Sequence, residues 1–153
     1  MDSSSSGRPD WRAFRALRAP ERRSLAATAI LLPASGLLLR LVGYRRLERM
    51  LARVVPLREG HPDGDRARAS ATSRMVAIGA SRSPFPSTCL SRSLTLWLLL
   101  RAQRIESEVC LGVRRKGSAL DAHAWVSHLG MPLNDGPDVD ERFATVHPRP
   151  PRA

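Results

Sequence analysis

Cys89 stands where a helix is expected to begin, and a cysteine in that position can serve as a nucleophile. Ser87 and Thr88 are residue types that cap helices, and the apolar positions after them recur at helical spacing as far as residues 103–104. The first turn of a helix offers unpaired N–H groups and the positive end of the helix dipole, which favours a thiolate. A cysteine there can equally be a buried packing residue. Cys89 therefore needs a partner base before it indicates catalysis.

A histidine and an aspartate in the last third of the chain supply that base and its partner. Residues 122–129 alternate in the manner of a strand that carries His123, and residues 132–135 predict a short next strand ending at Asp135 in the turn signal NDG. The two side chains are thus expected on adjacent antiparallel segments, close enough to pair. Thiol hydrolysis needs an imidazole to move the proton and a third group to orient the ring. The sequence predicts a triad of Cys89, His123 and Asp135, with backbone N–H groups at the helix start as oxyanion donors.

The other cysteine and histidines are assigned no chemistry. Cys110 falls within an expected strand over residues 108–114 and is interpreted as a packing residue. His128 is expected to be exposed on the opposite face from His123, His61 to lie in a solvated loop, and His147 to lie in a disordered tail. Two cysteines and scattered histidines do not have the spacing of a metal site, so no metal ion and no cofactor are expected.

The N-terminal half predicts helices that support this site. Residues 25–39 carry no charge but include Pro33 and Gly36, and we expect a pair of core helices broken near Pro33. The run is shorter than the roughly 20 apolar residues of a spanning helix, and its long charged leader lacks a signal-peptide cleavage pattern. Membrane anchoring is therefore not expected. With only two cysteines, the chain is expected to lie in the cytoplasm with reduced thiols.

Further apolar stripes predict where the remaining helices pack. An amphipathic helix is expected to bury the stripe Leu37, Leu41, Tyr44, Leu47, Leu51 and Val54. After a loop over residues 56–65, a helix over residues 66–79 is expected to bury Ala67, Ala71, Met75 and Ile78.

Helices followed by a small antiparallel sheet make the expected fold class α+β, of the transglutaminase-like or papain-like kind. We expect a disordered or weakly helical segment over residues 1–23, a peptidase domain over 24–146 and a disordered tail over 147–153. A short helix within residues 11–23 would end before Pro20.

The charge of the chain gives little support to a nucleic-acid partner. There are 25 Lys plus Arg against 14 Asp plus Glu in 153 residues, for a formal net charge of +11. Such a balance attracts phosphates and acidic surfaces. Only Lys116 is a lysine, and the arginines are spread through every segment of the chain. The basic excess lies in residues 1–118, and the last 35 residues are mildly acidic. No nucleic-acid partner is expected, and a second large domain does not fit the length.

The motifs around the expected triad resemble a known family. CLSRSLTLWLLLRAQRI, the strand LGVRR, AHAWVS and PLND are similar to the transglutaminase-like leader peptidases of lasso peptide biosynthesis. In that family the cysteine that opens the helix, the histidine of AHAWV and the aspartate of LND form the triad, which correspond to Cys89, His123 and Asp135. Ser127 stands where many relatives have Glu, a difference expected to alter a surface or substrate contact.

The resemblance implies an activity and its partners. The enzyme would remove the leader from a ribosomally made lasso precursor and free the core peptide for a macrolactam synthetase. A separate small leader-recognition protein would bind the leader and present it. Arg45, Arg46 and Arg49 belong to the basic helices expected to form a docking surface for that protein or for an acidic leader.

Two other functions remain open from the sequence. The same acyl-enzyme could pass its acyl group to an amine rather than to water, as in a transglutaminase-like acyltransferase. A basic binding module with a non-catalytic cysteine is the third reading, and it predicts strongly salt-dependent binding that does not need Cys89.

Overall fold

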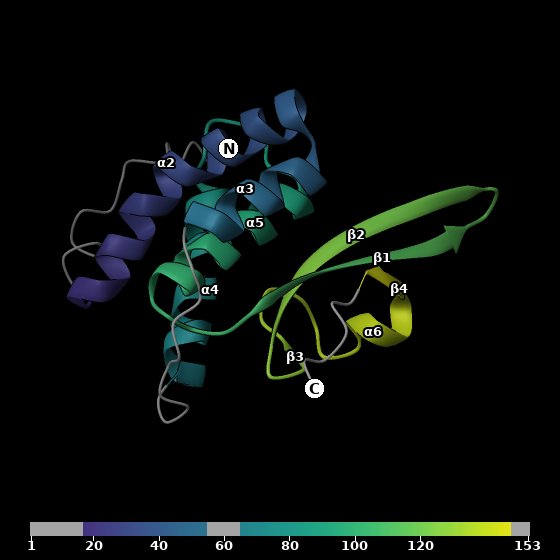
Figure 1. Ribbon diagram of the computed structural model, residues 1–153. Helices are drawn as coiled ribbons and strands as arrows, with labels where there is room; N and C mark the ends of the chain where they lie inside the picture. Colours follow the sequence, from purple (N-terminus) through teal and green to yellow (C-terminus); the bar gives the residue numbers. More distant parts are fainter. Residues whose placement is uncertain (1–16, 55–64, 148–153) are drawn as a thin grey trace, which may run out of the picture.

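The computed structural model describes residues 17–54 and 65–147, where helices are followed by a small antiparallel sheet (Figure 1). The helices in the first part of the chain are α2 (Ala19–Val42), α3 (Tyr44–Val54), α4 (Asp65–Ser81) and α5 (Cys89–Ala102). They are followed by β1 (Glu108–Lys116), β2 (Ala119–His128), β3 (Met131–Pro132), α6 (Val139–Arg142) and β4 (Ala144–His147). In this part of the chain the strands form one sheet in the order β3-β2-β1-β4, with antiparallel neighbours. The expected α+β class is confirmed.

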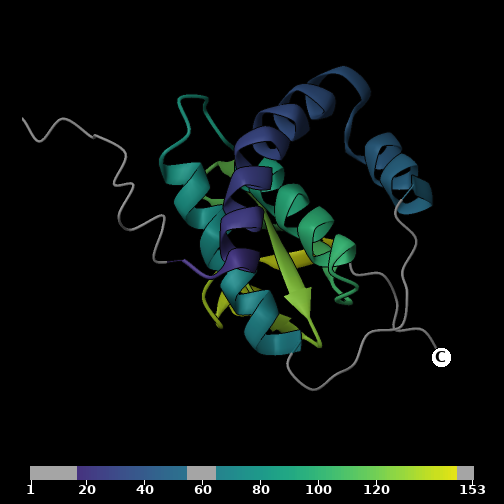
Figure 2. The same ribbon diagram turned by 90° about the vertical axis from the view of Figure 1, so that its left-hand side faces the viewer.

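Helix α5 is the centre of the molecule. It packs between α2 and α4 on one side and β2 on the other, and Figure 2 shows α2 lying along α4 and α5 with the sheet behind them. Its predicted bounds are confirmed, but the apolar stripe expected from the helical spacing, Leu90, Leu94, Trp97, Leu98 and Arg101, is too narrow. Leu96 and Leu100, which lie outside that stripe, have no exposed surface. A helix covered on several sides buries residues all round, which helical periodicity alone does not indicate.

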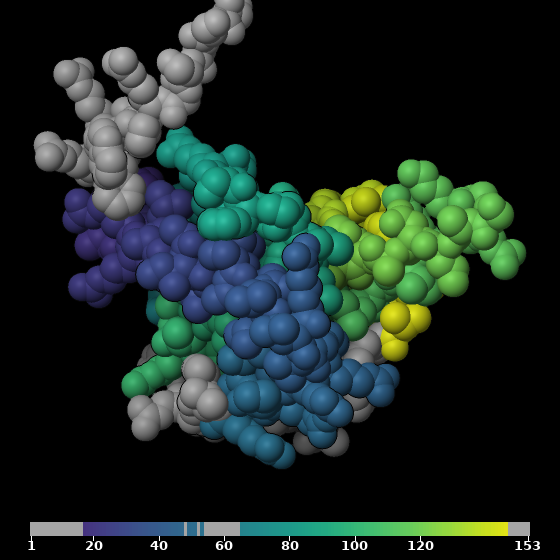
Figure 3. Space-filling view, turned by 90° about the horizontal axis from the view of Figure 1, so that it is seen from above, coloured from purple at the N-terminus to yellow at the C-terminus, as the bar shows by residue number. Residues whose placement is uncertain are grey.

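The two faces of the sheet belong to two separate apolar clusters, as the alternation of the strands predicts. Val109 and Val126 join the main core with α5. On the other face Cys110 and Trp125 pack with Phe143, next to α6. The β1–β2 hairpin extends away from α2, α3, α4 and α5, which gather on the opposite side of the molecule (Figure 3).

The expected break near Pro33 is wrong. Helix α2 runs through Pro33 to Val42 and is capped by Gly43, whose φ of +78° suits glycine. It also begins at Ala19, before the expected boundary at residue 24, with Pro20 inside its first turn. Proline is favourable there because the first N–H groups of a helix have no intrahelical partner.

The expected apolar stripe of α2 and α3 is only partly buried. Leu47 is buried and Tyr44 and Leu51 pack against the core, but Leu37 and Leu41 are 59% and 71% exposed. The turn at Gly43 separates these leucines from α3, so the stripe does not continue across the two helices. In the described part of the chain, α2 alone is long and apolar enough to cross a membrane by length and composition. Core helices and signal sequences pass the same test.

Helix α4 is close to its predicted bounds, but a different face is buried. Met75 is buried as expected, whereas Ala67 is exposed and Ala71 and Ile78 are half-buried. Small polar residues such as Ser73 and Thr72 occupy buried positions because their hydroxyls bond to carbonyls. A prediction from apolar residues alone therefore leaves out buried positions of this helix that are polar.

The end of the chain holds more structure than expected. Strand β3 is limited to Met131–Pro132, so Asp135 follows the strand rather than ending it. The expected disordered tail was placed too early, because the backbone of His147 pairs with Leu111 in β4. His61 lies outside the described residues.

Candidate active site

Cys89 is the first residue of α5 and is half-buried. Thr88 caps the helix: its Oγ1 accepts from the N–H of Ser91 at 3.1 Å, and its carbonyl accepts from the N–H of Arg92 at 3.1 Å. Of the unpaired N–H groups of a helix start, those of Cys89 and Leu90 remain without an acceptor among the described residues. A thiol and two free N–H donors therefore share one end of the helix.

His123, in the middle of β2, is hydrogen-bonded through Nε2 to Oδ2 of Asp135. This confirms the expected pairing across the hairpin and leaves Nδ1 as the ring nitrogen that a thiol can use. The ring stacks on Phe143 with centroids 4.9 Å apart and an interplanar angle of 27°. Trp125 lies further along the same face of the strand, at 6.2 Å. The imidazole is thus fixed by one hydrogen bond and an aromatic platform.

Asp135 is held as a carboxylate by three donors. Its Oδ1 accepts from the N–H of Gly136 at 2.7 Å and from the guanidinium of Arg142, while Oδ2 takes the His123 bond. Burial alone would raise the pKa of Asp135, but the bonds from Gly136, His123 and Arg142 outweigh it and hold that pKa below its ordinary value. The group facing the imidazole is therefore ionised at neutral pH.

Replacing Arg142 with alanine is expected to raise the pKa of Asp135 toward its ordinary value. A depressed carboxyl pKa stabilises the fold above the unfolded-state pKa, and this contribution is lost as the pH falls through the folded-state value. The variant should therefore show a weaker loss of stability on acidification. A carbon-13 NMR titration of the Asp135 carboxyl, with parallel urea unfolding at several pH values, measures both effects.

Arg114→Ala is the matched control for this measurement. Arg114 lies over the same Phe143 ring, 4.5 Å from its centroid, but pairs with Asp121. An unchanged Asp135 pKa in Arg142→Ala, or an equal rise in the control, would contradict the assignment of Arg142 to this carboxylate.

Gly112 makes room for the platform beneath His123. It pairs with His123 across β1 and β2, and a Cβ atom added to it would lie 2.8 Å from Cβ of Phe143 and 2.9 Å from the Trp125 ring. Both atoms belong to buried side chains, so neither can move freely. A side chain at this position would displace the ring on which His123 rests.

Gly112→Ala is accordingly expected to lower the free energy of unfolding by about 1–3 kcal/mol, the usual cost of overpacking a core. Urea denaturation measures this effect. Gly36→Ala in α2 is the control because nothing lies within 4 Å of its added Cβ. That variant should be neutral or more stable by up to about 1 kcal/mol. Equal stability of the two variants would contradict the tight packing under His123.

Cys89 is not hydrogen-bonded to His123 among the described residues, but the two elements that carry them are joined beside the site. Ser93, one turn after Cys89 on α5, donates through Oγ to the carbonyl of Ala124 at 3.0 Å. Ala124 is the residue after His123. The thiol and the imidazole thus belong to elements that are tied together near both residues.

The second cysteine has the environment of a packing residue, as predicted. Cys110 is buried with Trp125 and Phe143. Burial, followed by the charges of Glu108 and Asp140, raises the pKa of its thiol to about 12. A thiol in this state is a poor nucleophile at neutral pH.

The expectation that His128 is exposed is wrong, since it is only 5% exposed. Its Nδ1 bonds to the carbonyl of Glu106, and its Nε2 has no hydrogen-bond partner among the described residues. His128 is the last residue of β2, and the turn that follows it lines a pocket together with residues of α4. Ser127 is also buried, which corrects the expectation that it alters a surface contact.

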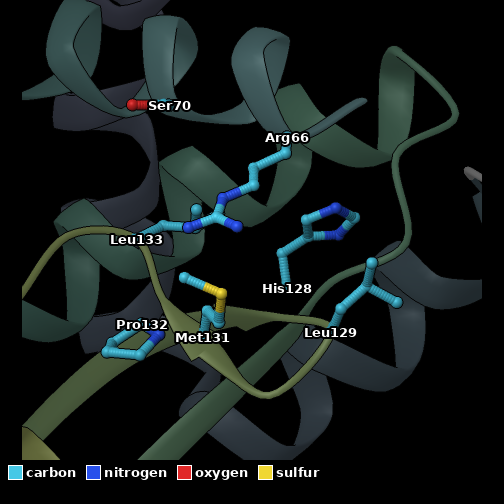
Figure 4. Close-up of a pocket in the computed structure, with 7 residues that line it drawn as sticks. All are labelled: Arg66, Ser70, His128, Leu129, Met131, Pro132 and Leu133. Carbon is cyan, nitrogen blue, oxygen red and sulfur yellow. The ribbon is translucent and has the colours of Figure 1, made fainter. Parts of the chain in front are cut away.

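A pocket of about 240 Å³ lies beside His128 at the β2–β3 turn (Figure 4). The residues that line it are Arg66, Ser70, His128, Leu129, Met131, Pro132 and Leu133. None of the three expected catalytic residues is among them, so this pocket is separate from the His123–Asp135 pair. No group of three or more His, Cys, Asp or Glu side chains in the described ranges could hold a metal ion.

The sequence reasoning missed Arg142 and Phe143, which complete the surroundings of the pair. Arg142 is the last residue of the short helix α6 and Phe143 follows it, in a segment for which the sequence predicted no element. The acidic and basic residues of DVDER gave a signal for a helical turn, but nothing in their spacing indicated that the turn folds back on Asp135.

The profile of the Transglutaminase-like superfamily matches residues 29–147. The chain belongs to the transglutaminase-like superfamily. No curated protein and no solved structure matches it. The match runs from α2 to β4, so it includes all three expected site residues of this transglutaminase-like domain. The superfamily includes cysteine peptidases and acyltransferases, which supports acyl-transfer chemistry of that general kind.

Proposed function

We propose that this protein is a cysteine peptidase that removes the leader from a lasso precursor peptide in the cytoplasm. The observation that carries the proposal is the hydrogen bond between His123 of β2 and an ionised Asp135, with β2 packed against the helix that Cys89 begins. A carboxylate, an imidazole and a thiol in this order are the groups that thiol hydrolysis requires.

In the first half of the reaction, His123 holds the proton of the Cys89 thiol on Nδ1. The thiolate attacks the carbonyl carbon of the scissile peptide bond, and the electron pair of the C=O bond moves to the oxygen. The free N–H groups of Cys89 and Leu90 are suited to stabilise this oxyanion. The C–N bond then breaks, the leaving amine takes the proton from Nδ1, and the leader remains as a thioester on Cys89.

In the second half, water replaces the amine. His123 takes a proton from a water molecule while the water oxygen attacks the thioester carbonyl. The C–S bond then breaks, and the leader is released with a free carboxylate. Asp135 stays ionised throughout and stabilises the imidazolium that forms twice. The protein side chains supply every proton transfer in this cycle.

The motifs of the catalytic half indicate the substrate class. AHAWVS contains His123 and PLND contains Asp135, and both motifs resemble those of the lasso leader peptidases. These two residues form the hydrogen-bonded pair described above. We therefore infer a precursor peptide as substrate and a separate leader-recognition protein as partner. The released core peptide would pass to a macrolactam synthetase.

The exposed arginines of α3 are a candidate docking surface for that recognition protein or for an acidic leader. Arg45, Arg46 and Arg49 are all exposed, while Leu47 of the same helix is buried. Replacing the three arginines with glutamate should raise the KM for the presented precursor by about tenfold, because surface charges chiefly affect encounter. Unchanged cleavage kinetics at low salt would exclude this surface.

Product masses test the proposed activity against its closest alternative. The wild-type protein is incubated with a lasso precursor and recognition protein, with and without an added primary amine. Hydrolysis predicts a leader that ends in a free carboxylate in both reactions. A leader that carries the amine in place of the carboxylate would identify a transglutaminase-like acyltransferase instead.

A further inference from the structure

A chain of polar contacts joins the three segments that carry the proposed catalytic residues. Ser93 has no exposed surface, and its Oγ donates to the carbonyl of Ala124 at 3.0 Å. Nδ2 of Asn134 donates to the same Oγ at 3.0 Å, and Oδ1 of Asn134 accepts from the N–H of Val126 at 2.7 Å. The Ser93 hydroxyl therefore both donates and accepts a hydrogen bond, and each end of the Asn134 amide has a partner.

Each of these contacts is made next to a catalytic position. Ser93 lies one turn after Cys89 on α5, Ala124 directly follows His123, and Asn134 directly precedes Asp135. Residues four apart on a helix share a face, so the face that begins at Cys89 is the one tied to β2.

The position of Asn134 also explains how Asp135 leaves the sheet. The N–H of Leu133 donates to the carbonyl of Val126 at 2.9 Å, which continues the pairing after β3 ends. The side chain of Asn134 then takes the N–H of Val126 in place of a backbone carbonyl. The backbone is thereby free to turn at this point and bring Asp135 under His123.

We propose that Ser93 and Asn134 are positioning residues that set the Cys89 thiol in register with the His123–Asp135 pair. The inference rests on the proposed function, since it assigns these residues to the same triad. Neither side chain contacts the reacting atoms, and both act by holding α5, β2 and the segment after β3 in one arrangement. A misplacement of about 1 Å in such a site can cost about a hundredfold in rate.

The reaction of Cys89 with iodoacetamide tests this without any peptide substrate. The Cys89 sulfur displaces iodide, and mass spectrometry of the digested protein gives the rate at Cys89 separately from Cys110. The ratio of wild-type to His123→Ala rates at pH 6 measures the enhancement that His123 gives the thiol. Ser93→Ala and Asn134→Ala are each expected to remove most of it, lowering the Cys89 rate by about tenfold.

Ser73→Ala is the matched control. Its Oγ also donates to a backbone carbonyl, that of Leu133 at 2.8 Å, but it comes from α4, which carries no proposed catalytic residue. We expect a similar fall in melting temperature for Ser73→Ala and Ser93→Ala, with the enhancement lost only in Ser93→Ala. Asn134 is an exposed residue, so its variant should fold even if Ser93→Ala does not.

The outcomes separate this inference from the proposed function. An enhancement that survives in both Ser93→Ala and Asn134→Ala overturns the positioning role and leaves the triad intact. An equal loss in Ser73→Ala also overturns it, because any anchor of this segment would then have the same effect. A wild-type protein whose Cys89 reacts no faster than in His123→Ala overturns both the positioning role and the proposed triad.

Discussion

Cys89→Ala is expected to lose at least about a thousandfold in the rate of leader cleavage, the scale on which removal of a nucleophile acts. Without Sγ no thioester can form, and the free N–H groups at the start of α5 can only assist direct attack by water. The rate is measured under single-turnover conditions with the precursor and the recognition protein, followed by mass spectrometry of the leader.

Cys110→Ala controls for the loss of a thiol as such. Cys110 lies in the cluster beneath the sheet, and burial raises the pKa of its thiol to about 12. This variant should retain cleavage within a few-fold of wild type, with reduced stability. Full activity in Cys89→Ala, or loss only in Cys110→Ala, would reject the assigned nucleophile.

Asp135→Asn is expected to reduce kcat by about a thousandfold or more while KM changes little, as in other triads that lose their carboxylate. The amide removes the charge that stabilises the imidazolium and can donate to Nε2, which favours the wrong tautomer of His123. In a pH profile of kcat measured on the same precursor, both the maximal kcat and the shape of the profile should differ from those of the wild type.

Asp121→Asn is a matched control for this change. Asp121 lies on the same strand as His123 and binds Arg114 at 2.8 Å, but it is not hydrogen-bonded to the histidine. Its amide variant should cleave at close to the wild-type rate. Comparable kcat values for the two variants would show that Asp135 does not support the imidazole.

The catalytic half of the molecule was largely predictable because its signals are local. Thr88 caps a helix that does begin at Cys89, and alternation places His123 and Cys110 on faces that the structure confirms. The pairing of His123 with Asp135 followed from a short hairpin between them. Each of these features depends on residues close in sequence.

The parts that the sequence did not predict depend on distant contacts. Pro33 stays inside α2 because packing against α4 and α5 supports the helix, which outweighs the local cost of proline. Arg142 reaches Asp135 only because α6 folds back beneath the sheet. His128 is buried because the end of β2 meets the carbonyl of Glu106 from the α5–β1 connection. Periodicity within a segment carries no information about these neighbours.

Family membership and site geometry support different parts of the proposed function. The match over residues 29–147 establishes the transglutaminase-like domain. A fold alone does not determine a reaction, so the proposed peptidase activity rests on the residues Cys89, His123 and Asp135. The lasso precursor as substrate depends in turn on the motifs that carry these residues.

Labelling of the protein by a leader peptide that ends in a chloromethyl ketone tests the central claim most directly. A thiolate at the cleavage site should displace chloride and become covalently attached to the leader. We predict attachment of one leader at Cys89, located by tandem mass spectrometry, which excess precursor prevents and which His123→Ala slows strongly. Attachment at another residue, or no attachment by a preparation that cleaves the precursor, would contradict the proposed mechanism.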